Sequence, residues 1–248
     1  MSAKDLSMSP SLLEQLAPTG VLRAGINMGN FLLVTGRSQA GEPEGVSPDM
    51  ARAIAVKLGV EVRFVPFATP GELADAAGND VWDVGLIGAE PQRAAKIDFS
   101  PAYVEIQSTY MVPPASTLQT VADVDRNGVR IASTARAAYD LWLERNIRNA
   151  TVVRTASLDA AFEAFATDGL EALAGLRPRL VVDQAKMPGA RILPGQFMAV
   201  QQAIGTTRGN ADAAGFIRIF VEQAKASGFV AGLIKRHKVN GLSVAPAA

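Results

Sequence analysis

Apolar and polar positions alternate with two different periods through the first hundred residues. Val60–Phe67 places an apolar residue at every second position, which is typical of a strand. Pro48–Leu58 repeats its apolar residues at helical spacing, with Ser47 as the predicted N-cap and Gly59 directly after its end. In order along this part, the pattern predicts strand Val21–Asn27, helix Pro48–Leu58, strand Val60–Phe67, helix Pro70–Ala77 and strand Asp83–Gly88.

The same pattern begins again after residue 106. It predicts strands Gln107–Val112, Val129–Ser133, Ala150–Thr155, Glu171–Leu176 and Ala199–Thr207, with helices Ala137–Arg148, Leu158–Thr167 and Pro178–Lys186 between them and one or two helices over Ala211–His237. Strands that alternate with helices are typical of a mostly parallel sheet with helices on both faces. Two stretches of this kind predict an α/β protein with two lobes.

Composition excludes several classes of function. The formal net charge is +0 and no basic tract is present, so we expect no nucleic-acid partner. The chain has no cysteine, which excludes disulfides, zinc–thiolate sites and cysteine nucleophiles. No apolar stretch is long enough to span a bilayer, so membrane insertion is not expected either.

The N-terminal segment bears on the compartment. Met1–Pro10 lacks the apolar core and the cleavage site of a secretory leader. Ser11 and Glu14 have the spacing of a capping box, which predicts a short surface helix.

The segment Pro91–Tyr103 is the most informative part of the chain. It places Arg93 one turn beyond the carboxyl end of the buried strand Asp83–Gly88. In open α/β sheets, ligands bind outside the carboxyl ends of strands. A guanidinium there, with backbone N–H groups beside it, suits a carboxylate held by two hydrogen bonds. The sequence therefore predicts that Arg93 anchors an acidic ligand.

Five segments in register resemble one known family. They are Val21–Asn27, the "GxxxDxAxAIA"-like Glu44–Ala55, the "RxxxxxFSxPY"-like Arg93–Tyr103, the "DAxxAL"-like Ser157–Phe165 and the "xxDG"-like Lys225–Phe229. Together they are similar to the extracellular solute-binding proteins of family 3, the type 2 periplasmic binding proteins that deliver amino acids and related molecules to ABC transporters. The resemblance runs from about Val21 to Lys238, which is nearly the whole chain.

The resemblance implies a type 2 periplasmic-binding-protein fold with a two-stranded hinge. Lobe 1 would be discontinuous, residues 1–112 and 204–248 including the N-terminal helix, and lobe 2 would be residues 113–203. The protein would close on a small anionic ligand and deliver it to an ABC permease. The compartment stays open: the periplasm by resemblance if a leader has been removed, and the cytoplasm if the chain is native as given.

In lobe 1 the resemblance assigns ligand contacts to two loops. Arg93 would bind the carboxylate, and Gly88 and Ala89 would offer backbone N–H groups to it. Glu90 stands where the family usually has a hydroxyl residue, so it would pair with Arg93 or accept a donor from the ligand. After the first strand, Asn30 and Phe31 occupy the position of polar and aromatic contacts, with core packing as the alternative for Phe31.

In lobe 2 the resemblance points to the segment Arg136–Tyr139. Its backbone N–H groups would meet the same carboxylate at a helix N-terminus. Arg136 and Ala137 stand where the family usually has glycine and a hydroxyl residue, and Ala138 follows. If Arg136 faces the cleft, the site would favour a dianion. If it faces solvent, it has no role in binding.

Gly175 stands near the position where the family has an aspartate that binds the ligand's α-ammonium. Glycine has no side chain for that purpose, and a buried ammonium without a counter-charge costs several kcal/mol. An ordinary α-amino acid is therefore not the expected ligand unless Glu90, Glu105 or Asp183 supplies the charge.

Sequence patterns for an enzyme are weak. The only histidine is His237, in a basic run that we expect to be a solvated helix end. No cluster has metal-ligand spacing, no phosphate-binding loop is present, and no cofactor is expected. The expected protein is therefore not an enzyme. The alternatives are a leaderless cytosolic sensor and a lyase similar to the cyclohexadienyl dehydratases, whose acidic residue near the position of Gly175 is missing here.

Overall fold

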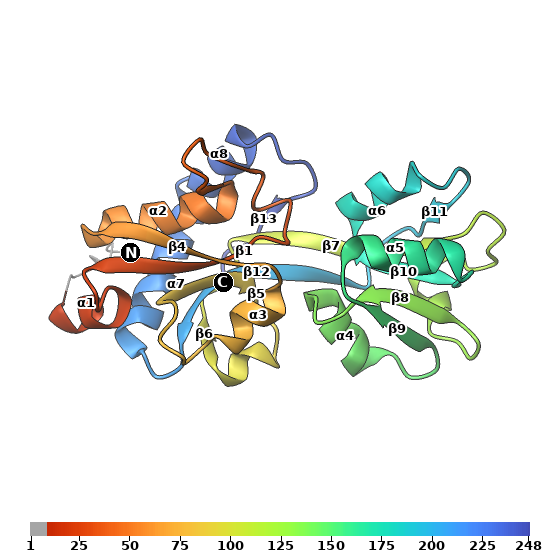
Figure 1. The fold of residues 1–248 in the computed structure, drawn as a ribbon, viewed down its shortest axis with the longest axis horizontal. Coiled ribbons are helices and arrows are strands. Elements are labelled where there is room, and N and C mark those ends of the chain that lie inside the picture. The colour runs from red at the N-terminus through yellow and green to blue at the C-terminus, as the bar shows by residue number, and fades with distance from the viewer. Residues whose placement is uncertain (1–8) are drawn as a thin grey trace. The chain divides into compact units, whose positions relative to one another are not determined.

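The computed structural model describes residues 9–248, and the first eight residues of the N-terminal segment lie outside this part. Strands and helices alternate along most of the described chain, so the predicted α/β class is confirmed (Figure 1). The helices are α1 Pro10–Leu16, α2 Val46–Leu58, α3 Pro70–Asp75, α4 Ala138–Asn146, α5 Leu158–Thr167, α6 Arg177–Gln184, α7 Ala211–Ala226 and α8 Phe229–Arg236, with short 3-10 turns η1 Arg93–Ala95 and η2 Val121–Val124. The strands are β1 Val21–Asn27, β2 Gly36–Arg37, β3 Pro43–Glu44, β4 Glu61–Phe67, β5 Val84–Gly88, β6 Ile97–Phe99, β7 Val104–Val112, β8 Arg130–Thr134, β9 Thr151–Thr155, β10 Ala172–Leu176, β11 Arg191–Ile192, β12 Met198–Thr207 and β13 Ser243–Val244.

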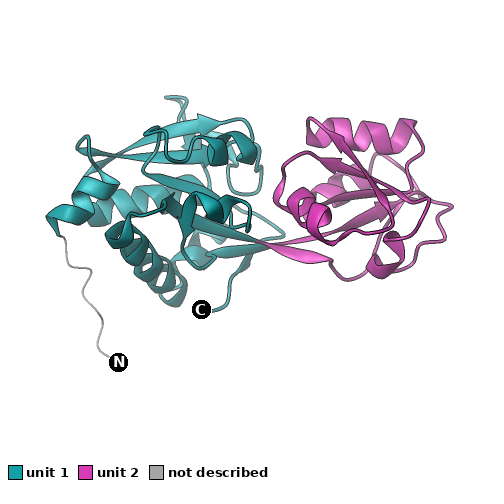
Figure 2. Ribbon diagram, turned by 90° about the horizontal axis from the view of Figure 1, so that it is seen from below, with its two compact units in different colours: residues 1–105, 201–248 teal, residues 106–200 magenta. Residues whose placement is uncertain are grey.

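The chain forms two compact units. Unit 1 contains residues 1–105 and 201–248, and unit 2 contains residues 106–200 (Figure 2). The chain passes from one unit to the other twice, within β7 and within β12. The C-terminal strand β13 pairs with the first residues of β7, so the end of the chain is part of unit 1.

The sheet of unit 1 has the strand order β4–β1–β5–β12. β1 is parallel to both β4 and β5, with Ile26 opposite Leu86, whereas β12 is antiparallel to β5. Because β1 and β5 are parallel neighbours, their carboxyl ends meet at one edge of the sheet. The loops that follow Asn27 and Gly88 therefore leave this unit side by side.

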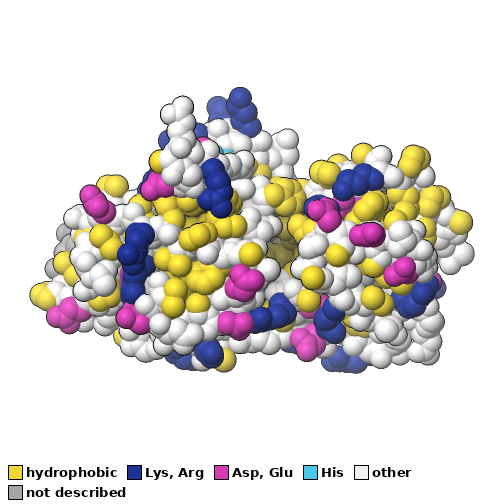
Figure 3. Space-filling view, viewed as in Figure 1, with side chains coloured by type: hydrophobic (Ala, Val, Ile, Leu, Met, Phe, Trp, Pro, Cys, Tyr) yellow, Lys and Arg dark blue, Asp and Glu magenta, His cyan; other side chains and the backbone are white. Residues whose placement is uncertain are grey.

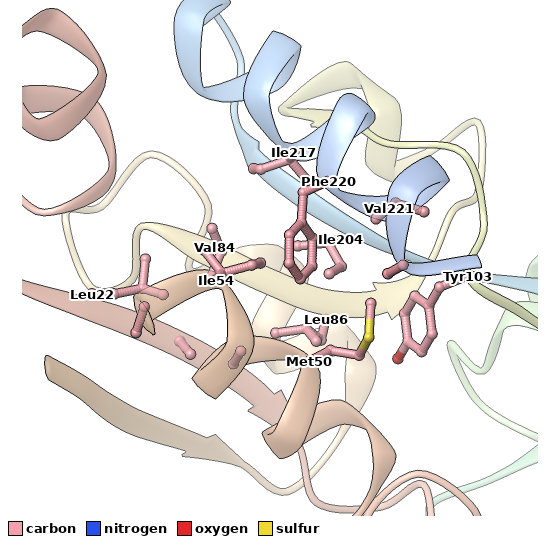
Figure 4. Packing of buried hydrophobic residues seen from close by; sticks show 14 of the residues in the cluster. Leu22, Met50, Ile54, Val84, Leu86, Tyr103, Ile204, Ile217, Phe220 and Val221 are labelled. Carbon is pink, nitrogen blue, oxygen red and sulfur yellow. The ribbon is translucent and has the colours of Figure 1, made fainter. Parts of the chain in front are cut away.

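Residues of β1 and β5 alternate between two apolar cores. Ala24 and Ile26 pack with α2 and α7 in the larger core, where Met50 of α2 and Phe220 of α7 point toward each other (Figure 4). Gly25 lies on the opposite face, and a Cβ at this position would meet the Trp82 ring at 3.2 Å. One face of β1 holds apolar side chains, whereas at Gly25 the other face is closely covered by the Trp82 ring. Because successive side chains of a strand point to opposite faces, the order of residues in β1 determines which face packs on which elements.

Unit 2 repeats this organisation with the strand order β7–β10–β8–β9, which continues the path of the same hydrogen-bonded sheet. Strand β8 is parallel to both β9 and β10. Ile131 and Ala174 pack on the α4 side with Tyr139, whereas Ala132 packs on the α5 side with Phe165. The carboxyl ends of β8 and β10 consequently lie at one edge, where α4 and α6 begin.

Two predicted helix starts are wrong. The N-cap of α1 is Ser9, whose side chain accepts a hydrogen bond from Leu12 N, so Ser11 is inside the helix and is not the cap. Helix α2 begins at Val46 with Gly45 as its N-cap, and Ser47 instead shares a hydrogen bond of 2.8 Å with the Tyr103 hydroxyl. In both cases the actual cap lies two residues upstream. Within residues 9–248, no helix is long and apolar enough to cross a bilayer.

Candidate functional site

The loop after β5 holds Arg93 against the end of that strand. The Arg93 side chain is buried, with 6% of the residue exposed, and its Nη1 donates a hydrogen bond of 2.8 Å to the carbonyl of Gly88. The backbone N–H of Arg93 donates to the carbonyl of Glu90, which closes a tight turn. Ala89 N donates to Gln201 O on β12 at 2.7 Å. The guanidinium is therefore fixed at the carboxyl end of the strand, away from bulk solvent.

Asn30 and Phe31 lie on the loop that follows the neighbouring strand β1. Asn30 is buried and uses its side-chain oxygen to accept from Leu32 N at 3.2 Å, which stabilises the turn itself. Phe31 is 38% exposed, so core packing does not account for this ring. Since β1 and β5 are adjacent and parallel, this loop and the Arg93 loop leave the same edge of unit 1. The predicted residues Arg93, Asn30 and Phe31 therefore lie on loops at one edge of the unit 1 sheet.

In unit 2 the predicted residues form the entry to α4. Arg136 has a φ of 62°, a left-handed conformation uncommon for a side chain of this kind, and Ala137 is the N-cap of the helix. Ala138 is the first helical residue and is buried. Because an alanine N-cap has no side-chain acceptor, the first turn lacks the usual cap. The N–H of Arg136 instead donates to Asp140 Oδ2 at 2.9 Å.

Asp140 and Ser133 are further polar groups at this helix start, and neither was among the predicted ligand contacts. Asp140 is 2% exposed and also accepts from Arg154 Nε at 3.0 Å, so its charge is balanced within unit 2. Ser133 is fully buried on β8, and its hydroxyl has no hydrogen-bond partner within the described residues. Burial also raises the pKa of the neighbouring Tyr139 to about 12, so this phenol is neutral near pH 7. The alternation of β8 could have identified Ser133 as a hydroxyl on a buried face.

Gly175 lies within β10, opposite Thr109 of β7. A Cβ at this position would meet Leu180 Cδ2 of α6 at 3.0 Å, so a side chain here would point into the α6 core. The lack of a side chain at Gly175 is therefore explained by packing. The residue at the end of the strand is Leu176, which has no charge either. Neither residue places a carboxylate at the end of β10.

The acidic residues considered as substitutes have other partners. Asp183 is 1% exposed and accepts from Arg179 Nε at 2.7 Å and from Lys186 Nζ at 2.9 Å. Glu105 Oε1 accepts from Gln201 Nε2 at 3.0 Å. Asp183 is thus already balanced by two cations. Glu90 is buried in the Arg93 loop and is the candidate of the three that lies beside the proposed anchor.

His237 is not a solvated helix end, contrary to expectation. Its Nε2 lies 2.8 Å from Asp49 Oδ2 of α2, and only 16% of its side chain is exposed. Within residues 9–248, no group of three or more His, Cys, Asp or Glu side chains could hold a metal ion. On the face seen in Figure 3, basic and acidic side chains are interspersed.

Comparison with known proteins gives one family and a consistent fold. The model of bacterial extracellular solute-binding proteins, family 3, matches residues 27–239. Among curated proteins, a cyclohexadienyl dehydratase of Pseudomonas aeruginosa is 25% identical over 159 residues. That alignment covers 62% of this chain, and the chain spans only 58% of the length of this relative.

Solved structures with the same fold include two amino-acid-binding proteins. An ancestral amino acid-binding protein, a precursor of cyclohexadienyl dehydratase, has a TM-score of 0.73 at 20% identity, over 90% of this chain and 97% of that one. A variant of ArgBP from T. maritima has a TM-score of 0.73 at 21% identity, over 92% and 100% of the two chains. These matches confirm the predicted type 2 periplasmic-binding-protein fold.

Proposed function

The chain belongs to the bacterial extracellular solute-binding proteins of family 3, and on that premise we propose that it binds a small carboxylate-containing metabolite for an ABC transport system. The proposed ligand is an acid other than an ordinary α-amino acid. The proposed partner is a permease of the ABC type. Binding, without chemical conversion of the ligand, is the proposed activity.

The observation that carries the proposal is the position of Arg93. Arg93 is buried and is held at the carboxyl edge of a parallel sheet by its hydrogen bond to the carbonyl of Gly88. A planar cation of this kind suits a carboxylate more specifically than a lysine would, because it can donate two parallel hydrogen bonds. The exposed ring of Phe31, on the adjacent loop, would contact an apolar part of the ligand.

Unit 2 has a second feature that suits an anion. The first turn of α4 lacks a side-chain cap, and the buried Ser133 hydroxyl on the preceding strand has no partner in the described chain. Backbone N–H groups and the positive end of the helix dipole favour negative charge at such a place. We propose that this helix start of unit 2 is a place for an anion, with Ser133 as a hydroxyl donor.

The absence of a charge at the end of β10 supports a ligand without an α-ammonium. Gly175 points into the α6 core and Leu176 is apolar, while Asp183 is balanced by Arg179 and Lys186. An ammonium without a counter-charge would cost several kcal/mol on desolvation. Deaminated acids avoid this cost, so they are the proposed class.

Native mass spectrometry of the purified protein, followed by thermal unfolding with a panel of acids, tests the proposal. A ligand that binds the native state raises the melting temperature by mass action, with about 2.7 kcal/mol of stabilisation at a hundredfold excess over Kd. We expect deaminated acids to raise the melting temperature of the wild type more than the corresponding amino acids do. We expect no acid to raise the melting temperature of Arg93→Ala. If no carboxylate raises the melting temperature of the wild type, or if Arg93→Ala responds equally, the proposal is wrong.

A dehydratase-like lyase is the second candidate, favoured by the 25% identity to cyclohexadienyl dehydratase. Against it stands the lack of a carboxylate at Gly175 and Leu176, near the position where those enzymes have an acidic residue. Incubation with prephenate-like acids and analysis of the products separates the two candidates. Turnover that Arg93→Ala abolishes would replace the binding proposal with the enzymatic one.

A further inference from the structure

A hollow on the surface of unit 1 lies between α2, α7 and α8, away from the residues of the proposed ligand site. Its volume is about 610 Å³, within the range of small-molecule sites. The three helices belong to the same unit and pack on one core (Figure 1, Figure 4). Its lining consists of Asp49, Arg52, Ala53, Val56, Lys57, Phe220, Gln223, Ala224, Ser227, Phe229 and Arg236.

Small side chains of two helices are part of the lining. On α2 the lining residues follow the spacing of a single helical face, with Ala53 at its middle, and on α7 they do the same around Ala224. Val56 is 79% exposed beside them, which is unusual for an aliphatic residue of this size. Phe220 and Phe229 add aromatic surface. The hollow therefore has apolar surface between the charged and polar side chains that also line it.

The charges around the hollow are unequal at its two ends. At the end where α2 begins, Asp49 lies 3.1 Å from Arg52, 3.6 Å from Arg236 and 2.8 Å from His237. The carboxylate there is already balanced. Lys57, at the opposite end of α2, makes no side-chain hydrogen bond or ion pair within the described residues. Lys57, which has no acidic partner within the described residues, thus lies at one end of the hollow.

The C-terminal end of helix α8 meets the start of α2 at the hollow. Arg236 of α8 lines it, and His237, directly after α8, contacts Asp49 of α2. From Asp49 to Lys57 the groove is about 12 Å long, which follows from the rise of 1.5 Å per residue. That length suits a saturated chain of about ten carbons.

We propose that this hollow binds an anionic amphiphile, a fatty acid of about ten carbons, with its carboxylate at Lys57 and its chain along Ala53, Val56 and Ala224 toward Phe229. The chain replaces water at the apolar lining, and the carboxylate provides the acidic partner that Lys57 lacks. The site is independent of the one proposed at Arg93.

Titration calorimetry with decanoate, octanoate and acetate tests the proposal on the full chain. We expect decanoate to bind, octanoate to bind about tenfold more weakly because two buried methylenes are lost, and acetate not to bind. Lys57→Glu should weaken the binding of decanoate by about fivefold or more. Ala53→Phe fills the groove from an incompletely buried position and should abolish binding. Far-ultraviolet circular dichroism checks that both variants fold.

Two further variants distinguish decanoate binding in the hollow from binding elsewhere on the protein. Arg218→Glu changes an exposed cation on α7 that does not line the hollow, and it should bind decanoate as the wild type does. Arg93→Ala should also bind decanoate unchanged, which distinguishes this proposal from the function proposed above. The proposal is overturned if decanoate does not bind, if folded Lys57→Glu and Ala53→Phe bind it normally, or if Arg93→Ala abolishes its binding.

Discussion

Replacing Arg93 by alanine should have two separate effects, one on ligand affinity and one on folding. Truncating one partner of a buried, hydrogen-bonded charge pair costs about 2–5 kcal/mol. That range corresponds to an increase in Kd of about 30-fold to about 4000-fold. The variant also removes the donor to the Gly88 carbonyl, whose bond is 2.8 Å long and buried. Leaving that acceptor unsatisfied costs about 1–3 kcal/mol of unfolding free energy.

Lys96→Ala is the matched control. Lys96 is a cation three residues further along the same loop, and it is exposed. Removing it should change binding by less than about 1 kcal/mol, because exposed charges are screened by water. Titration calorimetry gives the affinity of each variant, and urea unfolding gives its stability. Equal affinities for Arg93→Ala and Lys96→Ala would refute the anchoring role, even if the stabilities differ as expected.

Four further substitutions test other parts of the structure. Asp83→Asn should lower the unfolding free energy by about 3–5 kcal/mol, because it leaves the buried Arg23 guanidinium without its main partner. Asp80 is an exposed partner of the same arginine, so Asp80→Asn should lower the unfolding free energy by less than about 1 kcal/mol. Urea unfolding measures both effects. The hydrogen bond from Arg130 lowers the pKa of Glu171, so this carboxylate stabilises the fold above its ordinary pKa and loses that effect as pH falls through the depressed folded value. The stability difference between wild type and Glu171→Gln should therefore shrink as pH falls through that folded value, and a difference that stays constant with pH would contradict this. Ser133→Ala should leave the unliganded protein about as stable as the wild type, because no hydrogen bond within the described residues is lost. The variant should bind the acid ligand more weakly in calorimetry. A large loss of stability would show that the hydroxyl has a partner in the fold.

The repeating pattern of the chain was sufficient to predict the α/β class and most of the elements. Val21–Asn27 and Leu158–Thr167 have the predicted bounds, because glycine-containing turns follow both segments. The short strands β6 and β13 were not predicted. Strands of two or three residues are too short to show a period, and their pairing with β12 and β7 depends on the rest of the fold.

Positions in the candidate site could be predicted only where chain order fixes them. Arg93 could be placed beyond the end of β5 because it follows that strand closely, whereas the position of the Asn30 loop depends on the parallel pairing of β1 with β5, which chain order does not give. The direction of Gly175 could not be predicted, because it depends on which face of β10 packs on α6. The role of Ser47 was also hidden, since its partner Tyr103 is distant in the sequence.

Titration calorimetry with matched pairs of acids decides whether Arg93 anchors a deaminated acid. Each pair shares one carbon skeleton, and one member lacks the α-ammonium. The account predicts that the wild type binds the deaminated member of at least one pair more tightly and that Arg93→Ala loses this binding. Tighter binding of the amino acid in every pair, with Arg93→Ala binding equally well, would contradict it.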